Sequence, residues 1–329
     1  MHCLATAYLL AVLSPTLAPA ASAAFELKTS QACLLVDREG RVALKPKDAA
    51  CPAPAPFRTP LWVITLAEGT NAFRPGPKVL TSLAAPPQVS PTAGGVRILY
   101  DGIRHGDKTF DIRLDLSITV ADDEFRFGGT IVNKTKDRIV TEWKYPVLLG
   151  IAGKRDAGPP VAPAVFWPDG LGRRFLTPES FGPRRTFAYP GGRGTMQWLA
   201  FTHGATGLYF GCHDPKCSTK TFAVARSSVG GAGYDVSLEH RPYCVPGEQW
   251  EGPAAVAMPF AGSWHVAATR YRRWVDSWLD PLPKPKWAQD STGWFLVILK
   301  QQNGDRMWDY RSLDRLADLA EQRGLDTLG

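Results

Sequence analysis

The sequence predicts a mainly β protein: a large antiparallel β-sandwich, followed by the first βα unit of a truncated (β/α)8 barrel. Three observations lead to this fold. The segment 110–120 alternates strictly between apolar and polar side chains, and many short apolar segments are separated by turn residues. In the last part of the chain, which ends at residue 329, an apolar run is followed by an amphipathic helix and then by the beginning of a second apolar run. This order is typical of a parallel α/β domain.

The clearest strand is the segment 110–120. Its apolar side chains point to one face and its polar side chains to the other, which is typical of an antiparallel strand with one buried face. Asp122 and Asp123 then turn the chain, and residues 125–132 return as the second strand of a hairpin. The apolar face holds Phe110, Ile112, Leu114, Leu116, Ile118 and Val120.

Further β segments are spaced between turn residues, which favours a sandwich. The segment 155–185 is rich in charged and turn residues, and we expect a loop there. Asn133-Lys134-Thr135 matches the N-glycosylation pattern, but one such match says little. The other predicted strands are 25–28, 33–36, 42–44, 61–66, 139–151, 196–201, 207–212, 222–226, 234–240 and 254–259.

A helix is predicted after Gly262, because aromatic side chains recur there at helical spacing. Such a stripe usually packs against a domain surface. The Pro-rich segment 280–286 is typical of an extended linker, so we place the domain boundary there. The packed face is expected to hold Ala267, Tyr271, Trp274 and Trp278, and the solvent face Arg270, Arg272, Arg273 and Asp276.

Residues 290–329 predict one βα unit. The run 293–299 is almost continuously apolar, as expected for a strand buried on both faces of a parallel sheet. The helix that follows has Asp309 or Ser312 as its N-cap and Gly324 after its end. A (β/α)8 barrel takes about 250 residues, so we expect it to continue beyond residue 329. The alternative is an appendage that packs on the preceding domain. The apolar helix face holds Leu313, Leu316, Ala317, Leu319 and Ala320.

The composition is that of a globular protein, with 44% hydrophobic and 21% charged residues. The net charge is +7 and the pI is about 9.1. The basic residues are scattered and form no stripe, so the charge does not indicate nucleic-acid binding.

Residues 1–23 are predicted to be a signal peptide. The apolar segment 4–17 is too short to span a bilayer, and Ala21-Ser22-Ala23 fits a cleavage site. The residues before this apolar segment include His2 but no Lys or Arg. Two alternatives therefore stay open: an uncleaved membrane anchor, or a misplaced translation start. We expect a secreted or periplasmic protein without a membrane span after signal cleavage. The expected domains are the signal peptide 1–23, the sandwich 24–262, a connecting helix and linker 263–289, and the barrel start 290–329.

Five cysteines remain after cleavage. In an oxidising compartment, Cys33–Cys51 and Cys212–Cys217 are the natural local disulfides, which leaves Cys244 as a free, buried thiol. The segment 212–217 lacks the spacing of the usual zinc patterns, and no second ligand pair is evident. We therefore expect no metal and no other cofactor.

Short motifs between Trp143 and the end of the chain resemble one secreted group, the glycoside-hydrolase-like domain-of-unknown-function family 6259. This family is distantly similar to α-galactosidase-type enzymes. The resemblance implies a galactose mutarotase-like supersandwich followed by a TIM barrel, with an oligosaccharide or polysaccharide as substrate. The motifs are Met196-Gln197-Trp198, residues 207–215, Trp264 with Tyr271-Arg272-Arg273-Trp274, residues 293–295 and 300–304, and Trp308-Asp309-Tyr310.

The resemblance also implies hydrolysis of O-glycosidic bonds. Two carboxylates on barrel strands perform this chemistry, and both are expected beyond residue 329, so no catalytic residue is assigned and the fragment by itself should be inactive. Lys300, Gln302 and Trp308 follow the first barrel strand, at the face where barrel active sites form, and are candidate substrate contacts. Alternatively, Lys300 pairs with a carboxylate of a neighbouring strand and Trp308 caps the barrel.

His213 and Asp214 are further candidates for substrate binding, from a loop after a sandwich strand. The alternative is a turn stabilised by Asp214 and the Cys212–Cys217 bridge. Two other functions stay open: a noncatalytic carbohydrate-binding sandwich, and a mutarotase-like isomerase with a histidine acid and a carboxylate base. The histidines available for an isomerase, His203, His213 and His240, lie in no motif of that enzyme family.

Overall fold

A computed structural model describes residues 24–68, 78–83, 85–153, 159–191, 193–227 and 233–328. The predicted signal peptide 1–23 lies outside these ranges. The chain divides into two compact units, Met1–Trp278 and Leu279–Gly329. The division falls inside the segment predicted as a connector, because helix α2 (His265–Asp276) belongs to the first unit. Within the described ranges, no helix is both long and apolar enough to cross a membrane.

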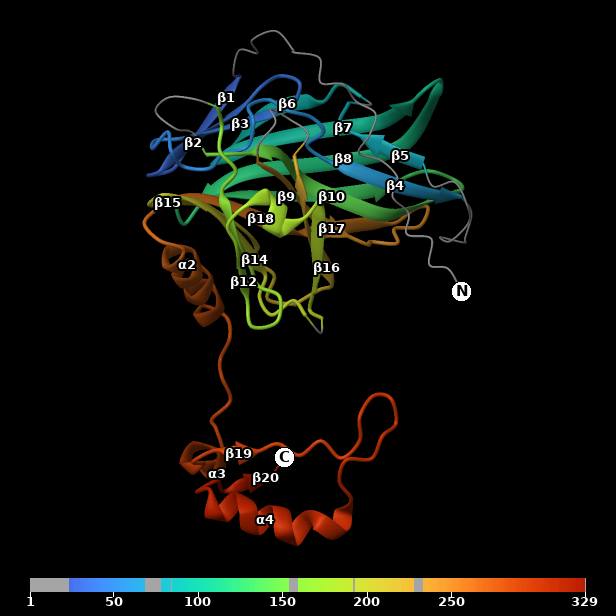
Figure 1. Ribbon diagram of the computed structural model, residues 1–329. Helices are drawn as coiled ribbons and strands as arrows, with labels where there is room; N and C mark the ends of the chain where they lie inside the picture. The colour runs from blue at the N-terminus through green and yellow to red at the C-terminus, as the bar shows by residue number, and fades with distance from the viewer. Residues whose placement is uncertain are drawn as a thin grey trace. The chain divides into compact units, whose positions relative to one another are not determined.

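The first unit is built from antiparallel sheets (Figure 1). Nine strands follow the order β12-β11-β14-β15-β18-β9-β8-β7-β6, six the order β13-β16-β17-β10-β4-β5, and β1-β2-β3 form a small third sheet. The prediction of a mainly β protein with large antiparallel sheets is confirmed. The strands are β1 (Phe25–Lys28), β2 (Ala32–Val36), β3 (Val42–Pro46), β4 (Val63–Glu68), β5 (Lys78–Thr81), β6 (Gln88–Thr92), β7 (Gly95–His105), β8 (Lys108–Ala121), β9 (Glu124–Asn133), β10 (Arg138–Ile151), β11 (Ala164–Trp167), β12 (Arg173–Phe175), β13 (Arg184–Tyr189), β14 (Trp198–His203), β15 (Thr206–Cys212), β16 (Lys220–Arg226), β17 (Tyr234–His240) and β18 (Gln249–Ala261).

The hairpin β8–β9 has the predicted alternation. The side chains of Phe110, Ile112, Leu114, Leu116 and Ile118 are all buried in the main core. Asp122 and Asp123 join the strands with φ angles of 53° and 64°, the left-handed conformation that tight hairpin turns require. The turn sets the register so that Glu124 is the first residue of β9 and pairs with Ala121.

Aromatic side chains fill part of the core over two paired glycines. The ring of Trp143 stacks on Tyr145, with centroids 5.6 Å apart, and meets the edge of Trp250. Gly129 and Gly252 are register partners beneath them. A Cβ at Gly252 would lie 2.7 Å from the Trp143 ring, so only glycine leaves room for this packing.

The segment 155–185 is not the predicted loop. It contains β11, β12 and the one-turn helix α1 (Pro178–Phe181), and β13 begins at its end. These elements are short, and turn residues separate them, so their pattern is weak in the sequence. They form because Val165, Trp167 and Phe181 are buried in the main core.

The predicted Cys33–Cys51 disulfide is not formed, since both residues are free thiols. Cys33 Sγ lies 2.9 Å from Glu26 Oε1 at the surface, whereas Cys51 is buried and donates to the carbonyl of Gly207 at 3.2 Å. The two side chains therefore occupy different environments. Cys244 is a buried free thiol, as predicted.

The predicted Cys212–Cys217 disulfide is also absent. Cys212 is fully buried at the end of β15, whereas Cys217 is partly exposed, with its Sγ 3.6 Å from the hydroxyl of Tyr189. Burial raises the pKa of the Cys212 thiol to about 12, so this thiol is protonated at neutral pH.

The second unit has the predicted order of strand, helix and strand. β19 (Trp294–Phe295) pairs in parallel with β20 (Thr327–Leu328), and α4 (Leu313–Gln322) connects them. A short helix α3 (Lys286–Asp290) precedes β19, and a 3-10 turn η1 (Tyr310–Ser312) precedes α4. Leu316 and Ala320 of α4 are buried.

Three details of the second unit refine the prediction. The cap is Asp309, which accepts a hydrogen bond from the backbone N–H of Arg311, whereas Ser312 makes no side-chain cap. Gly324 has a φ of 69° after α4, as predicted. The strand predicted for 293–299 is shorter than expected, and it is not buried on both faces: Trp294 is 68% exposed.

Candidate functional site

Helix α2 covers the face of the nine-stranded sheet that points away from the main core. Ala267 of this helix is fully buried in a second core, so the predicted packing of the stripe is confirmed. Arg270, however, was expected to face solvent, and its side chain is only 13% exposed. It lies on the buried face because it is three residues from Ala267 and four from Trp274. The sheet side of this core consists of Trp198, Ala200, Tyr209, Val256, Met258 and Phe260.

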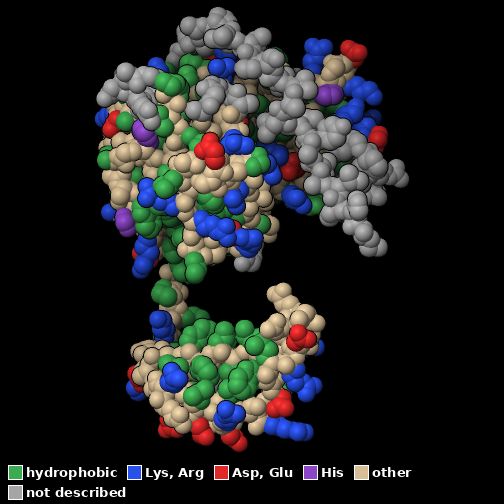
Figure 2. Space-filling view, viewed as in Figure 1, with side chains coloured by type: hydrophobic (Ala, Val, Ile, Leu, Met, Phe, Trp, Pro, Cys, Tyr) green, Lys and Arg blue, Asp and Glu red, His purple; other side chains and the backbone are tan. Residues whose placement is uncertain are grey.

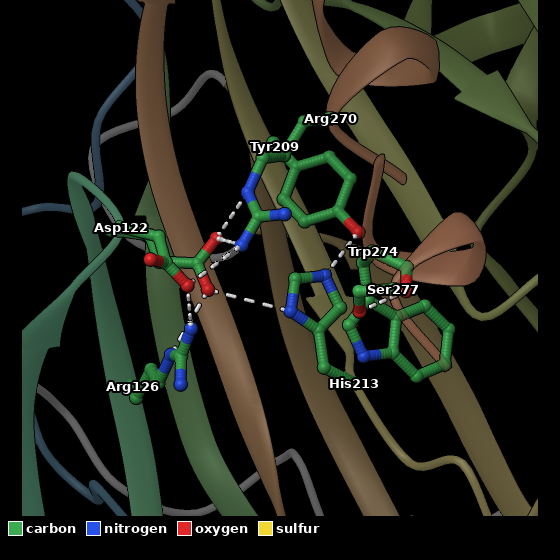
Figure 3. Close-up of polar contacts among 8 residues, drawn as sticks. Asp122, Arg126, Tyr209, His213, Arg270, Trp274 and Ser277 are labelled. Carbon is green, nitrogen blue, oxygen red and sulfur yellow. Dashed lines mark hydrogen bonds and ion pairs between the residues drawn. The ribbon is translucent and has the colours of Figure 1, made fainter. Parts of the chain in front are cut away.

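His213 lies under α2 and contacts three other side chains (Figure 3). Its Nε2 is 3.0 Å from the hydroxyl of Tyr209, and its Nδ1 is 3.4 Å from Glu124 Oε1. The imidazole stacks on Trp274, with ring centroids 4.8 Å apart. The imidazole thus links β9, β15 and α2.

Glu124 is the centre of this polar cluster. Its carboxylate is fully buried and accepts hydrogen bonds from Arg126 Nε at 3.0 Å and from Arg270 Nε at 2.7 Å. Burial tends to raise the pKa of Glu124, but the nearby His213 imidazole and the hydrogen bond from Arg270 outweigh it, and the pKa is lowered. For His213, burial outweighs the carboxylate, and the pKa is lowered too. These two pKa shifts indicate that the Glu124 carboxylate is charged and the His213 imidazole is neutral at pH 7.

This hydroxyl–imidazole–carboxylate chain has the order of groups that activates a nucleophile in some hydrolases. Here the hydroxyl belongs to Tyr209, which is fully buried, and burial raises the pKa of Tyr209 well above its usual value. His213 is itself only 7% exposed. Substrate cannot reach such groups, so the cluster holds α2 on the sheet and does not act on a ligand.

Asp214 forms a turn, which is the alternative that the sequence left open. Its carboxylate accepts hydrogen bonds from the backbone N–H groups of Lys216 and Ser218, at 3.0 and 2.7 Å. It also lies 3.0 Å from Nζ of Lys220, which is completely buried and donates to Gln197 Oε1 at 2.9 Å. The Asp214 carboxylate is therefore occupied inside the protein, although no disulfide supports the turn.

The histidines considered for an isomerase do not form an accessible acid–base pair. His240 lies inside the sandwich, with its ring 5.3 Å from that of Trp250. The adjacent Glu239 points to the opposite face of β17, where it binds Lys144 and Arg184. His203 is half-buried at the end of β14, beside Gly153.

Lys300, Gln302 and Trp308 lie together in the second unit, on the loop after β19. Lys300 pairs with Arg306 across a single β-bridge, and Gln302 is in the turn between them. The backbone N–H of Trp308 donates to the carbonyl of Leu299 at 3.3 Å, next to Lys300. All three side chains are exposed. This loop is the candidate functional site.

The segment 294–299, which begins with β19 and leads to this loop, has one open apolar face. Exposure alternates along it, with Phe295, Val297 and Leu299 half-buried and the residues between them exposed. Hydrophobic side chains gather on the second unit in Figure 2. The open face carries Trp294, Leu296 and Ile298, which are 68%, 62% and 54% exposed, and Lys300 follows at the same spacing.

Sequence reasoning missed Glu124, Arg270 and Arg306. Glu124 follows two turn aspartates, so it resembles a third turn residue. Arg270 had a usable signal, its spacing to Ala267 and Trp274. For Arg306 the sequence contains no such signal: Asn303-Gly304 marks a turn, but a two-residue hairpin there would place Arg306 opposite Gln301 and not opposite Lys300. No group of three or more His, Cys, Asp or Glu among the described residues is arranged to hold a metal ion.

No protein-family model matches the chain. No curated protein sequence matches it either. Solved structures do match. An α-N-acetylgalactosaminidase from Bifidobacterium bifidum, in complex with GalNAc, is 13% identical with a TM-score of 0.57, and the match covers 92% of this chain and 50% of that chain. An α-galactosidase from Lactobacillus brevis is 10% identical with a TM-score of 0.44, covering 92% and 48%. A galactose mutarotase related enzyme from Lactobacillus acidophilus is 8% identical with a TM-score of 0.45, covering 73% and 98%.

The likeness to the Bifidobacterium structure shows that the chain has a glycoside-hydrolase-like fold. The part of this chain that the match leaves out is shorter than the second unit. The match therefore includes at least part of the second unit. The chain spans about half the length of this structure.

Proposed function

We propose that this chain is the N-terminal part of an exported glycoside hydrolase that acts on O-glycosidic bonds, related to the glycoside-hydrolase-like domain-of-unknown-function family 6259. The observation that carries the proposal is the likeness, across most of the chain, to half of an α-N-acetylgalactosaminidase. A large sandwich followed by a parallel βα unit is the same order of parts that the sequence motifs predict.

In this proposal the second unit begins a (β/α)8 barrel. Its strands β19 and β20 are parallel and α4 connects them, which is the repeating unit of such barrels. Parallel sheets are covered on both faces, yet Trp294, Leu296 and Ile298 form an apolar face that the described residues leave open. Side chains of further barrel strands would cover this face.

The site of the proposed enzyme lies at the carboxyl end of β19, where barrel active sites form. Lys300 and Gln302 would donate hydrogen bonds to sugar hydroxyls, and Trp308 would stack on a sugar ring. The carboxylates that serve as acid and as nucleophile or base belong to later strands. His213 and Asp214 have no part in this site, because their polar atoms are bound within the sandwich.

The test is to sequence the locus past the codon for Gly329 and to assay the complete gene product on aryl glycosides of both anomers. We expect further βα repeats with carboxylates at strand ends, and hydrolysis that is lost when either carboxylate becomes an amide. A stop codon after Gly329, or a folded complete product without activity on any glycoside, would contradict the proposal. A noncatalytic carbohydrate-binding sandwich would then be the function to pursue.

A further inference from the structure

The loop after β19 holds two basic side chains side by side. Lys300 and Arg306 are partners in an antiparallel bridge. The flanking hydrogen bonds run from Gln301 N–H to Asp305 O at 2.8 Å and from Met307 N–H to Leu299 O at 2.9 Å. Since these bonds lie on either side of the pair, Lys300 and Arg306 form a non-hydrogen-bonded pair. This is the type of pair in which opposite side chains are closest and share one face.

Like charges in such a position destabilise a hairpin, unless an anion lies between them. Neither Lys300 nor Arg306 makes a side-chain hydrogen bond or ion pair with any residue that the structure describes. The two acidic side chains that follow in the sequence, Asp305 and Asp309, have other partners. Asp305 accepts a hydrogen bond from Asn303 Nδ2 at 2.7 Å, and Asp309 caps η1 through the N–H of Arg311. The cationic pair therefore lacks a counterion within the part of the second unit that the structure describes.

We propose that Lys300 and Arg306 together bind the anionic group of an acidic saccharide, either the carboxylate of a uronic acid or a sulfate ester. The guanidinium offers two parallel N–H donors that match such a group, and the ammonium adds a second charge. Trp308, 38% exposed, lies beside the pair to contact the sugar ring. The inference rests on the proposed function and specifies its substrate class.

The experiment measures the affinity of the complete gene product for three ligands that differ at C6. These are D-galactose, D-galacturonate and D-galactose 6-sulfate, with the corresponding three forms of glucose as a second series. The variants are Lys300→Gln and Arg306→Gln. The controls are Lys284→Gln and Arg315→Gln, which remove one exposed positive charge elsewhere in the second unit. Titration calorimetry at one fixed salt concentration gives the affinities.

We expect one or both anionic forms to bind more tightly than the neutral sugar. The form that binds most tightly identifies the anionic group of the natural substrate, a carboxylate or a sulfate. Each variant should lower the affinity for the anionic form about tenfold, because it removes a hydrogen bond to a charged group. The affinity for the neutral sugar should not change in Arg306→Gln, and neither control should change the affinity for any of the ligands. The thermal midpoint of either variant should equal or exceed that of the unchanged protein, because like-charge repulsion is removed.

Two results would overturn the proposal and separate it from the proposed function. If neutral and anionic sugars bind equally and the variants match the controls, the cationic pair does not recognise substrate, although the protein still binds carbohydrate. If the variants lower the thermal midpoint, the pair is neutralised by a carboxylate of the protein, and the inference fails. If no sugar binds and no glycoside is hydrolysed, the proposed function fails together with the inference.

Discussion

The imidazole of His213 lies parallel to the indole of Trp274, with an angle of 8° between the ring planes and 4.8 Å between the centroids. The indole covers the imidazole from above, while Glu124 and Tyr209 bind its two nitrogens from the sheet. Helix α2 is thus attached to the nine-stranded sheet by a polar cluster as well as by an apolar core. This attachment holds the last helix before the Pro-rich segment.

Replacing Trp274 with alanine should loosen this attachment. The variant loses the ring that covers His213, and we expect the free energy of unfolding of the first unit to fall by about 2 kcal/mol. Urea denaturation followed by circular dichroism measures it. Arg273→Ala is the matched control, because Arg273 is on the exposed side of the same helix and should change stability by less than about 0.5 kcal/mol. Equal effects of the two variants would show that the contact does not hold the helix.

The ion pair of Lys220 and Asp214 should matter more than any pair on the surface. Lys220→Met leaves the buried Asp214 carboxylate without its cation, which costs about 3 kcal/mol. Adding Asp214→Asn should recover part of this loss, since no unpaired charge then remains. Arg272→Met is the control, because Arg272 and Asp276 are both exposed, and such pairs contribute less than about 1 kcal/mol. Denaturant unfolding measures the loss of stability in each variant. If Lys220→Met lost no more stability than the control, the buried pair would not stabilise the fold as expected.

Strands of the sandwich could be predicted from the sequence where one face of the strand is exposed to solvent. Along β8 the polar side chains alternate with Phe110, Ile112 and Leu114, so the period is visible in the sequence. The short strands β11 and β12 were missed, because tertiary contacts of Val165 and Trp167 stabilise them more than any local pattern does.

The polar partners in the candidate site and in the cluster under α2 were not predicted, because they depend on register and on contacts between distant segments. The pairing of Lys300 with Arg306 follows from the length of one turn, and the pairing of Glu124 with Arg270 joins segments far apart in the chain. A basic residue within a helical stripe also looks like a solvent-facing one. The sequence predicted candidate contacts in the loop 300–308, but it did not indicate the second cation beside Lys300.

All five thiols of the chain without its predicted signal peptide should be titratable after denaturation without reductant. Cys51, Cys212 and Cys244 are buried, and burial raises the pKa of Cys51 to about 12, so these thiols should resist Ellman's reagent in the native protein. Cys33 and Cys217 are partly exposed and should react slowly. Finding only one thiol after denaturation would instead support the two disulfides that the sequence predicts.

Asn133 should not carry a glycan, although it lies in Asn133-Lys134-Thr135. Its side chain is buried and donates to the carbonyls of Arg138 and Cys244, at 2.8 and 2.9 Å. Asn133→Ala removes both of these buried hydrogen bonds and should destabilise the protein by about 2 kcal/mol. Expression in a glycosylating host followed by intact mass measurement tests the first statement. An occupied sequon on folded protein would refute it.

His240 should make the protein sensitive to mild acid. Burial lowers its pKa from 6.5 to about 3, so the unfolded chain takes up a proton that the folded protein cannot. Stability is therefore complete above pH 6.5 and falls, as the pH drops towards 3, by about 1.4 kcal/mol per pH unit from this group.

His240→Phe keeps a ring between Trp143 and Trp250 and removes this titration. Between about pH 5 and 6.5, the slope of the unfolding free energy should be smaller in the variant. Glu124 and Asp214, whose pKa values are lowered from 4.5 and 3.8, contribute only below this window, and His213 supplies the slope that remains. His105→Gln, at an exposed position, is the control for the loss of one histidine. The same slope in all three proteins would mean that the buried ring of His240 can accept a proton in the folded state.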